Sequence, residues 1–233
     1  MMGEEKMNEE KKLTIHHIFW YFIIFSIIGL IIETIYCYIT SGVWESRKGL
    51  IWGPFCPVYG VSGAILLMCL NLCKDKSSWR LFLYGFVIGS IAEYILSYGL
   101  EAIYGMRFWE YNYLKFNLNG RICLVFSIYW GLLSVILIKF VQPLIDKFVD
   151  KMNYKVRNII EIILFLFFTI NCLFTIWGIQ TYQNRVLYHQ YNTSNHSIIQ
   201  QIENNYFTND RMSKTFPNLR IKDKNGKEIW IKT

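Results

Sequence analysis

Five charged side chains of this sequence stand inside or next to long apolar runs. Glu33, Glu93 and Glu101 lie within the runs, and Arg47 and Arg121 follow in the connecting segments. An ionisable side chain within a membrane span costs roughly 2.5–3.5 kcal/mol on insertion scales, so it must face protein or water. Buried charges of opposite sign also have to pair. We therefore expect Arg47 and Arg121 to be partners of Glu33 and Glu93, or anchors for an anionic substrate.

The spacing around these acids predicts that they lie on polar faces of helices. Every fourth position of one run is small or polar: Gly85, Gly89, Glu93, Ser97 and Glu101. Steps of three and four give the first run a similar face: Ser26, Gly29, Glu33, Tyr36 and Thr40. Because glycines permit close contact between helices, we expect Gly85 and Gly89 to seal a polar seam that continues into Glu93.

Three classes of function remain open for these residues. The first is a transport-type protein with a polar cavity on the outer side, in which Glu33 and Glu93 are gating or coupling acids. The second is a membrane-embedded enzyme acting on lipid or cell-wall intermediates, with Glu93 and Glu101 as acid and base. The third is a non-catalytic scaffold or sensor, in which ion pairs only pin the loops to the helices. Because no serine elbow, H-E-x-x-H or P-loop is present, we favour transport and assign no catalytic residue and no cofactor.

Length and composition predict a membrane protein. The chain has 233 residues, of which 53% are hydrophobic and only 18% charged, and a spanning helix needs about 20 apolar residues. We predict an all-α membrane domain of five transmembrane helices, which form two similar helical hairpins and a fifth helix. The predicted spans are 15–39, 58–73, 79–103, 122–141 and 159–179.

The basic residues predict an orientation for these spans. Near the ends of the predicted spans, 11 Lys and Arg residues lie on the side of the N-terminus and 6 on the other side, and Lys and Arg favour the cytoplasmic side. We therefore predict a multi-pass cell-membrane protein with a cytoplasmic N-terminus and the tail outside. The lipid bilayer is its first partner, and the net charge of +7 does not indicate nucleic acid. The oligomeric state stays open, with a homo-oligomer compatible with the sequence.

Composition divides the chain into three parts. Residues 1–13 form a charged cytoplasmic lead, residues 14–180 the transmembrane domain, and residues 181–233 a polar extracytoplasmic tail of α/β type. In the tail we predict a helix over 197–207 and a β-hairpin around Asn225-Gly226. The segment 142–158 has apolar residues at helical spacing and predicts an amphipathic helix at the membrane surface.

The two long loops add irregular backbone and aromatic side chains. Gly53, Pro54 and Pro57 interrupt helical hydrogen bonding, which membrane depth tolerates only where the backbone is buried in protein or lines a cavity. The sequence thus predicts a re-entrant or irregular outer loop. Cys56 and Cys123 both fall on the outer side, and a disulfide between them stays open. The cysteines lack the spacing and histidine partners of a metal site.

The two loops resemble a known family of bacterial integral membrane proteins, the ABC-transporter permease family of the CmpB type. The segment Arg47-Lys-Gly-Leu-Ile-Trp-Gly-Pro-Phe-Cys-Pro-Val-Tyr-Gly60 is similar to its R-G-x-x-x-G-P-x-x-P-x-Y-G block. The segment that starts at Trp109-Glu-Tyr and continues through Phe116-Asn117, Gly120-Arg121 and Trp130-Gly131 resembles its second block. The resemblance covers about residues 18–145.

This resemblance implies a permease that works with a separate ATPase subunit and handles a small molecule not identified by the sequence. The candidate residues for substrate binding or coupling, all within the region of resemblance, are Glu33, Arg47, Glu93, Glu101, Trp109, Tyr111, Asn117 and Arg121. The candidate residues for loop structure are Gly49, Gly53, Pro54, Pro57, Tyr59, Gly60, Gly120, Ser127 and Trp130. Lys48, Glu110, Lys115 and Asn171 depart from the pattern of the family.

Overall fold

The fold is mostly helical. The computed structural model describes residues 13–73, 77–188, 197–222 and 228–229, so the charged lead predicted over 1–13 lies almost wholly outside the described residues. The described helices include four that are long and apolar enough to cross a membrane and one shorter apolar helix. The five predicted spans therefore correspond to four helices of spanning length and the shorter α2.

The helices follow the apolar runs closely. The long ones are α1 (Ile15–Ser41), α3 (Ser78–Tyr104) and α6 (Tyr154–Tyr188), and the shorter α2 covers Pro57–Leu72. The remaining run forms α4 (Leu124–Ile136), which continues through a π-helical turn over Leu137–Val141 into α5 (Gln142–Lys151). Both α1 and α3 end at a glycine with a positive φ, Gly42 and Gly105, a conformation that glycine adopts without strain.

The first four helices form two hairpins with equivalent contacts. A Cβ atom added at Gly29 would lie 2.3 Å from the Cβ of Tyr59, and one added at Gly89 would lie 2.6 Å from the Cβ of Trp130. The interval from Gly29 to Gly89 is the same as that from Glu33 to Glu93. Each hairpin thus brings its helices together at a glycine one turn before its acid, opposite an aromatic residue.

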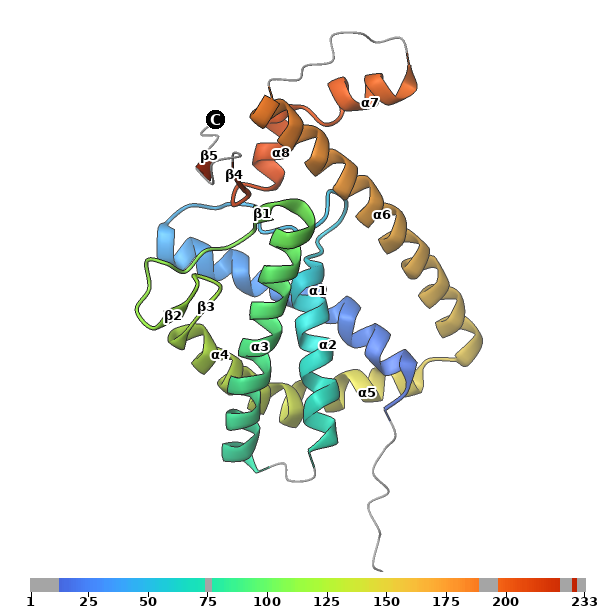
Figure 1. Cartoon of the computed structure of the whole chain (residues 1–233). Helices are drawn as coiled ribbons and strands as arrows, with labels where there is room; N and C mark the ends of the chain where they lie inside the picture. Colours follow the sequence, from blue (N-terminus) through green and yellow to red (C-terminus); the bar gives the residue numbers. More distant parts are fainter. Residues whose placement is uncertain (1–12, 74–76, 189–196, 223–227, 230–233) are drawn as a thin grey trace, which may run out of the picture.

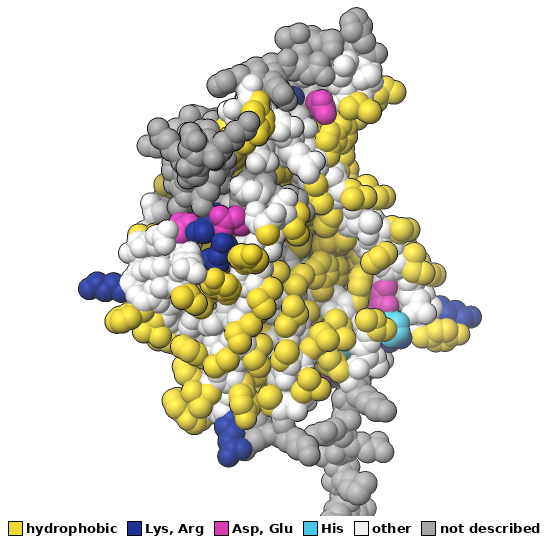
Figure 2. All heavy atoms as spheres, viewed as in Figure 1, with side chains coloured by type: hydrophobic (Ala, Val, Ile, Leu, Met, Phe, Trp, Pro, Cys, Tyr) yellow, Lys and Arg dark blue, Asp and Glu magenta, His cyan; other side chains and the backbone are white. Residues whose placement is uncertain are grey.

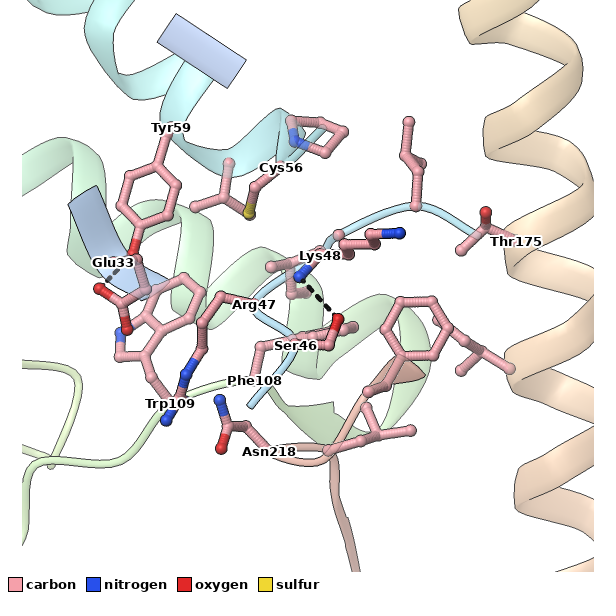
Figure 3. Close-up of a pocket in the computed structure, with 18 of the residues that line it drawn as sticks. Glu33, Ser46, Arg47, Lys48, Cys56, Tyr59, Phe108, Trp109, Thr175 and Asn218 are labelled. Atoms are coloured by element: carbon pink, nitrogen blue, oxygen red, sulfur yellow. Dashed lines mark hydrogen bonds between the residues drawn. The ribbon is translucent and has the colours of Figure 1, made fainter. Parts of the chain in front are cut away.

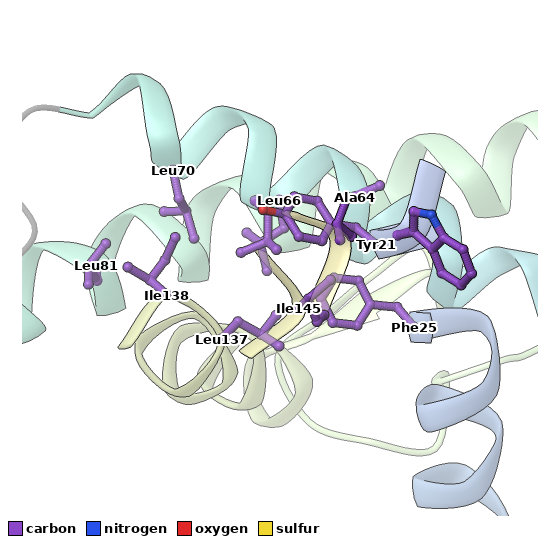
Figure 4. Packing of buried hydrophobic residues seen from close by; sticks show 12 residues of the cluster. Tyr21, Phe25, Ala64, Leu66, Leu70, Leu81, Leu137, Ile138 and Ile145 are labelled. Atoms are coloured by element: carbon purple, nitrogen blue, oxygen red, sulfur yellow. The ribbon is translucent and has the colours of Figure 1, made fainter. Parts of the chain in front are cut away.

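The hydrophobic core lies where the two hairpins meet α5. Figure 4 shows its buried side chains, which include Tyr21, Leu66, Leu70, Leu81, Leu137, Ile138 and Ile145. Beside this core, Asn71 Nδ2 donates to Gln142 Oε1 at 3.1 Å and Gln142 Nε2 donates to Asn71 Oδ1 at 3.2 Å. Such a reciprocal amide pair satisfies polar groups of both elements in an apolar environment. It joins α2 to the start of α5 at the end of the molecule opposite the long loops, hereafter the α5 end.

The first long loop, residues 43–56, packs against the middle of α6. Asn171, which is fully buried, accepts from the backbone N–H of Trp52 at 3.2 Å and donates to its carbonyl at 2.8 Å. Thr175 Oγ1 accepts from the N–H of Ile51 at 3.1 Å. These side chains replace the helical hydrogen bonds that the irregular backbone lacks. The disulfide left open above is not formed, because Cys56 and Cys123 are both free.

The tail packs on the loops rather than standing apart from them. It contains α7 (Ile198–Asn205), α8 (Asn209–Thr215), β4 (Arg220–Lys222) and β5 (Glu228–Ile229). The strand β4 pairs with β5 and also with β1 (Met106–Arg107), which follows α3. The predicted turn at Asn225-Gly226 lies outside the described residues. In Figure 1, α6 runs obliquely from the α5 end up to α7 and α8.

A buried cluster of apolar side chains attaches this tail to α6. Phe207 is fully buried in it, together with Ile51, Ile179, Tyr182, Met212, Phe216 and Ile221. Arg185, buried near the end of α6, donates to the carbonyl of Phe207 at 2.6 Å. In the second long loop, β2 (Asn117–Leu118) and β3 (Ile122–Cys123) form a separate two-stranded sheet.

The surface has the distribution expected of a membrane protein. On the face in Figure 2, hydrophobic side chains cover most of the middle of the molecule, and the few charged side chains lie in separate groups toward its edges. Along α6, large apolar side chains are more than half exposed: Ile159, Ile162, Ile163, Phe165, Leu166, Ile170 and Leu173. Water would make such a surface costly, whereas lipid would not.

Candidate functional site

A cavity of about 320 Å³ lies between the two long loops, the helices α1 to α4, α6 and the tail. Its volume is at the small end of the range of about 300–1,000 Å³ for ligand pockets. Five of the eight residues predicted to bind or couple substrate line it: Glu33, Arg47, Glu93, Trp109 and Tyr111. The other three, Glu101, Asn117 and Arg121, do not line it.

Glu93 is held in this cavity by two neutral donors. Its side chain is buried, with Oε1 accepting from the hydroxyl of Tyr111 at 2.8 Å and Oε2 accepting from the indole N–H of Trp130 at 2.8 Å. Tyr111 comes from the second long loop and Trp130 from α4. Because the indole N–H can only donate a hydrogen bond, it needs an acceptor, and the carboxyl oxygen of Glu93 supplies it. The two donors together fix the orientation of the carboxyl group.

Glu33 is held in a similar way by a single donor. Its Oε2 accepts from the hydroxyl of Tyr59 at 2.8 Å, which is the contact drawn in Figure 3. Tyr59 lies in the first turn of α2 and meets Glu33 one helical turn after Gly29. Among the described residues, no basic side chain lies within 4.0 Å of the carboxylate of Glu33 or Glu93.

The predicted pairing of these acids with Arg47 and Arg121 is therefore wrong. Arg121 is buried and forms an ion pair with Glu101, and its Nη1 donates to Ser97 at 3.1 Å. The reason is position along α3, since Ser97 and Glu101 lie one and two turns nearer the long loops than Glu93. The loop arginine thus pairs with Glu101 near the end of the helix, and Glu93 lies deeper and accepts hydrogen bonds only from neutral donors.

Glu101 also belongs to a larger ion-pair network that closes the second long loop. Arg107 Nε donates to Glu101 at 2.8 Å and Arg107 Nη1 donates to Glu110 at 2.6 Å. Burial alone would lower the pKa of Arg107, but the hydrogen bonds that it donates to Glu101 and Glu110, together with the charges of these acids, outweigh burial and raise the pKa. Glu101 is thus held by two arginines outside the cavity, which does not favour its predicted use with Glu93 as an acid–base pair.

Asn117 has a structural place in the same loop. Its Nδ2 donates to the carbonyl of Leu114 at 2.7 Å, and its Oδ1 accepts from the N–H of Gly120 at 3.0 Å. Gly120 has a φ of 67°, and a Cβ atom added there would lie 1.7 Å from an oxygen of Glu110. Only glycine fits this turn, which agrees with the structural role predicted for Gly120.

Arg47 and Lys48 are the basic residues of the cavity wall. Arg47 Nη2 lies 3.3 Å from Glu45 and also contacts the sulfur of Cys37, whereas its Nε is buried without a hydrogen-bond partner. Lys48 is exposed and lines the cavity next to it. In Figure 3, Arg47 lies on the same side as Glu33, and Thr175 lies on the opposite wall formed by α6.

Aromatic side chains form much of the wall around the two acids. Trp109 donates its indole N–H to the carbonyl of Arg121 at 3.1 Å, which fixes its ring beside the cavity. Tyr111 stacks on Phe126 with the ring centroids 4.6 Å apart. Burial, followed by the charge of Glu93, raises the pKa of Tyr111 well above its ordinary value. Tyr111 therefore stays protonated and keeps its hydroxyl available as a donor.

The candidate residues for loop structure divide into two groups. Gly49, Pro57, Tyr59 and Trp130 line the cavity, and Tyr59 and Trp130 are the hydrogen-bond partners of the two acids. The others lie outside it: Gly53, Pro54, Gly60, Gly120 and Ser127. Gly60 packs against Ser26 and the backbone of Phe22 on α1. Ser127 Oγ accepts from Ser90 Oγ at 2.7 Å and so joins α4 to α3.

Sequence reasoning missed the wall contributed by α6 and the tail. The missed residues include Cys172, Thr175, Ile176 and Ile179 of α6 and the tail segment Phe216–Leu219. Asn171 and Thr175, one turn apart in an apolar run, were the available signal that this face of α6 meets a polar neighbour. The tail carried no such signal. In the described part of the chain, no group of three or more metal-ligating side chains is present.

The comparisons with known proteins give a family for the chain. The family model described as "Putative ABC-transporter type IV" matches residues 20–176. No curated protein and no solved structure matches the chain. The match spans both hairpins, both long loops and most of α6, and therefore includes every predicted binding or coupling residue. Since it covers well over half of the chain, this multi-pass membrane protein belongs to the Putative ABC-transporter type IV family.

Proposed function

We propose that this protein is a permease-type membrane subunit whose cavity receives a small molecule from the outer side of the membrane. One observation carries the proposal: two acids, supplied by equivalent positions of two hairpins, line a single cavity and have no described basic partner. An acid kept in a membrane domain without a counter-ion indicates a binding or coupling site. Glu33, Glu93, Arg47, Trp109 and Tyr111 would contact the substrate.

In this proposal, all five apolar helices cross the membrane, including the shorter α2. The irregular loop 43–56 would lengthen that crossing, because its backbone is satisfied by Asn171 and Thr175 at mid-height of α6. The α5 end would face the cytoplasm, as the distribution of Lys and Arg favours. A separate ATPase subunit, suggested by the family description, would bind there. Glu101, Asn117 and Arg121 would keep the second loop in place without touching substrate.

Untargeted mass spectrometry of cells and medium tests the transport function without assuming a substrate. Cells that produce the wild-type chain should change the distribution of at least one small molecule across the membrane. The cavity variants Glu33→Gln and Glu93→Gln should abolish this change, while Asp210→Asn, an exposed pair with Lys214 in the tail, should retain it. Equal activity of the wild-type protein and both cavity variants at equal membrane levels would contradict the proposal.

Reporter fusions test the orientation independently. Alkaline phosphatase joined after Tyr113, in the second long loop, should be active, because this enzyme folds only outside the cytoplasm. The same reporter joined after Lys151, at the end of α5, should be inactive. The reverse pattern would place the cavity on the cytoplasmic side. Purification with mild cross-linking should also recover an ATPase if the subunit arrangement is correct.

A further inference from the structure

The charged residues of the cavity wall specify a ligand more narrowly than the proposed function does. The wall contains two acids, Glu33 and Glu93, and two bases, Arg47 and Lys48. No ion pair among the described residues joins the acids to the bases. The wall thus offers both signs of charge, unpaired with each other, and is neutral in total.

The acids are arranged to receive a positively charged group. Each accepts hydrogen bonds only from neutral donors, Tyr59 for Glu33 and Tyr111 with Trp130 for Glu93. These donors orient the carboxylates but do not neutralise them. Rings of Tyr59, Tyr111 and Trp130 also line the cavity, and aromatic faces attract ammonium groups. An ammonium group in the cavity would give these carboxylates a partner of opposite charge.

The basic side of the wall is arranged to receive an anion. Arg47 Nε is buried and lacks a hydrogen-bond partner, although Nη2 of the same guanidinium contacts Glu45 and Cys37. Arg47 as a residue lines the cavity, and guanidinium groups bind carboxylate and phosphate oxygens. Lys48 lies beside Arg47 on the wall and brings a second positive charge.

The rest of the wall is apolar. It includes Leu50 and Leu100, the ring of Phe108, and the side chains of Ile176, Ile179 and Phe216. Burial of apolar ligand surface against such a wall stabilises binding. The cavity of about 320 Å³ limits the occupant to a small molecule or to the head of a larger one.

We infer that the cavity takes an amphipathic zwitterion, a molecule with an ammonium group, an anionic group and a short apolar body. The ammonium would lie between Glu33 and Glu93, and the anionic group beside Arg47. An apolar amino acid and the headgroup region of an aminophospholipid share this chemistry. The inference rests on the proposed function, because it assigns a substrate class to the same cavity.

A matched ligand series tests the inference with the purified full-length protein in detergent, by isothermal titration calorimetry. L-Phenylalanine carries both charges, 2-phenylethylamine only the ammonium and 3-phenylpropionate only the carboxylate, on the same apolar body. Dihexanoyl phosphatidylethanolamine represents the lipid source. We expect one of the two zwitterions to bind at least about tenfold more tightly than either singly charged analogue, as buried charge pairs predict.

Variants assign each charge to its side of the cavity. Arg47→Gln should weaken the zwitterion and 3-phenylpropionate but leave 2-phenylethylamine unchanged. Glu33→Gln should weaken the zwitterion and the amine but leave 3-phenylpropionate unchanged, and Asp210→Asn should change none of them. Equal binding of a zwitterion and a singly charged analogue, or no binding of any probe to the wild-type protein, would overturn the inference. Cavity-dependent transport of a molecule without these charges would overturn it as well, while leaving the proposed function intact.

Discussion

The two hairpins hold equivalent acids in different ways. In the α1–α2 hairpin, Glu33 is half-buried and accepts one hydrogen bond, from Tyr59. In the α3–α4 hairpin, Glu93 is buried and accepts two, from Trp130 and Tyr111. Tyr59 and Trp130 occupy equivalent positions opposite Gly29 and Gly89, so Tyr111 is the additional donor. The second acid is therefore held more rigidly than the first.

The same difference extends to the loops that follow the acids. The second long loop is closed by ion pairs within its own hairpin, between Arg107 or Arg121 and Glu101. The first long loop instead depends on neutral hydrogen bonds that its backbone N–H groups donate to Asn171 and Thr175 of α6. The second half of the molecule is thus held by its own charges, and the first half by a neighbour. Reversible unfolding in mixed micelles would measure how much each of these contacts contributes to stability.

The largest effect is expected from the arginines of the two loops. Arg121→Gln removes a buried arginine that pairs with Glu101 and donates to Ser97. Breaking a buried ion pair costs up to about 3–5 kcal/mol, although Glu101 keeps its pair with Arg107. Arg47→Gln should cost less than about 1 kcal/mol of unfolding free energy, because its partner Glu45 is partly exposed and surface pairs contribute little. Similar losses for both variants would show that the two loops are held equally.

The next largest loss of stability is expected when alanine replaces either of the two glycines that face aromatic residues. Both Gly29→Ala and Gly89→Ala force the helices apart, because the added Cβ would lie within 2.5 Å of an atom of Tyr59 or Trp130. Overpacking of this kind costs about 1–3 kcal/mol. Gly99→Ala is the matched control on α3, since nothing lies within 4 Å of its Cβ position, and it should not destabilise the protein. If only one of the two variants, Gly29→Ala or Gly89→Ala, lost unfolding free energy, the contacts in the two hairpins would not be equivalent.

For the amide pair at the α5 end, we expect a double variant to regain most of the stability that a single variant loses. Asn71→Leu leaves the amide of Gln142 without its partner, which costs about 1–3 kcal/mol for a buried polar group. Adding Gln142→Leu replaces both amides with apolar groups and should restore most of that loss. A double variant that is less stable than either single variant would show that each amide also has an independent role.

The smallest effect is expected where α6 supports the first loop. Thr175→Val keeps the shape of the side chain but removes the acceptor for the N–H of Ile51, at a cost of about 1 kcal/mol. Thr169→Val serves as the control, because Thr169 is exposed and bonds only to its own helix. Unfolding curves that coincide for the two variants would mean that α6 does not hold the loop through this contact.

Much of the fold followed from local pattern. The apolar run that predicted a span over 79–103 became α3 at Ser78–Tyr104, because length and hydrophobicity determine where a helix forms in a membrane protein. The four-residue spacing of Gly89 and Glu93 likewise placed the acid beside a close helix contact. Of the five predicted site residues that line the cavity, the two helical acids Glu33 and Glu93 lie there for this reason.

The partners of those residues depended on distant parts of the chain. Arg121 lies beside Glu101 instead of Glu93 because the folded second loop brings this arginine to the end of α3, while Tyr111 of the same loop reaches Glu93. Phe216 and Leu219 line the cavity because β4 pairs with β1 and the tail packs on α6. Periodicity describes one helix at a time and carries no information about which loop or tail covers it. The sequence by itself therefore determined the helices and the acids they carry, whereas only the tertiary structure decided which groups surround those acids.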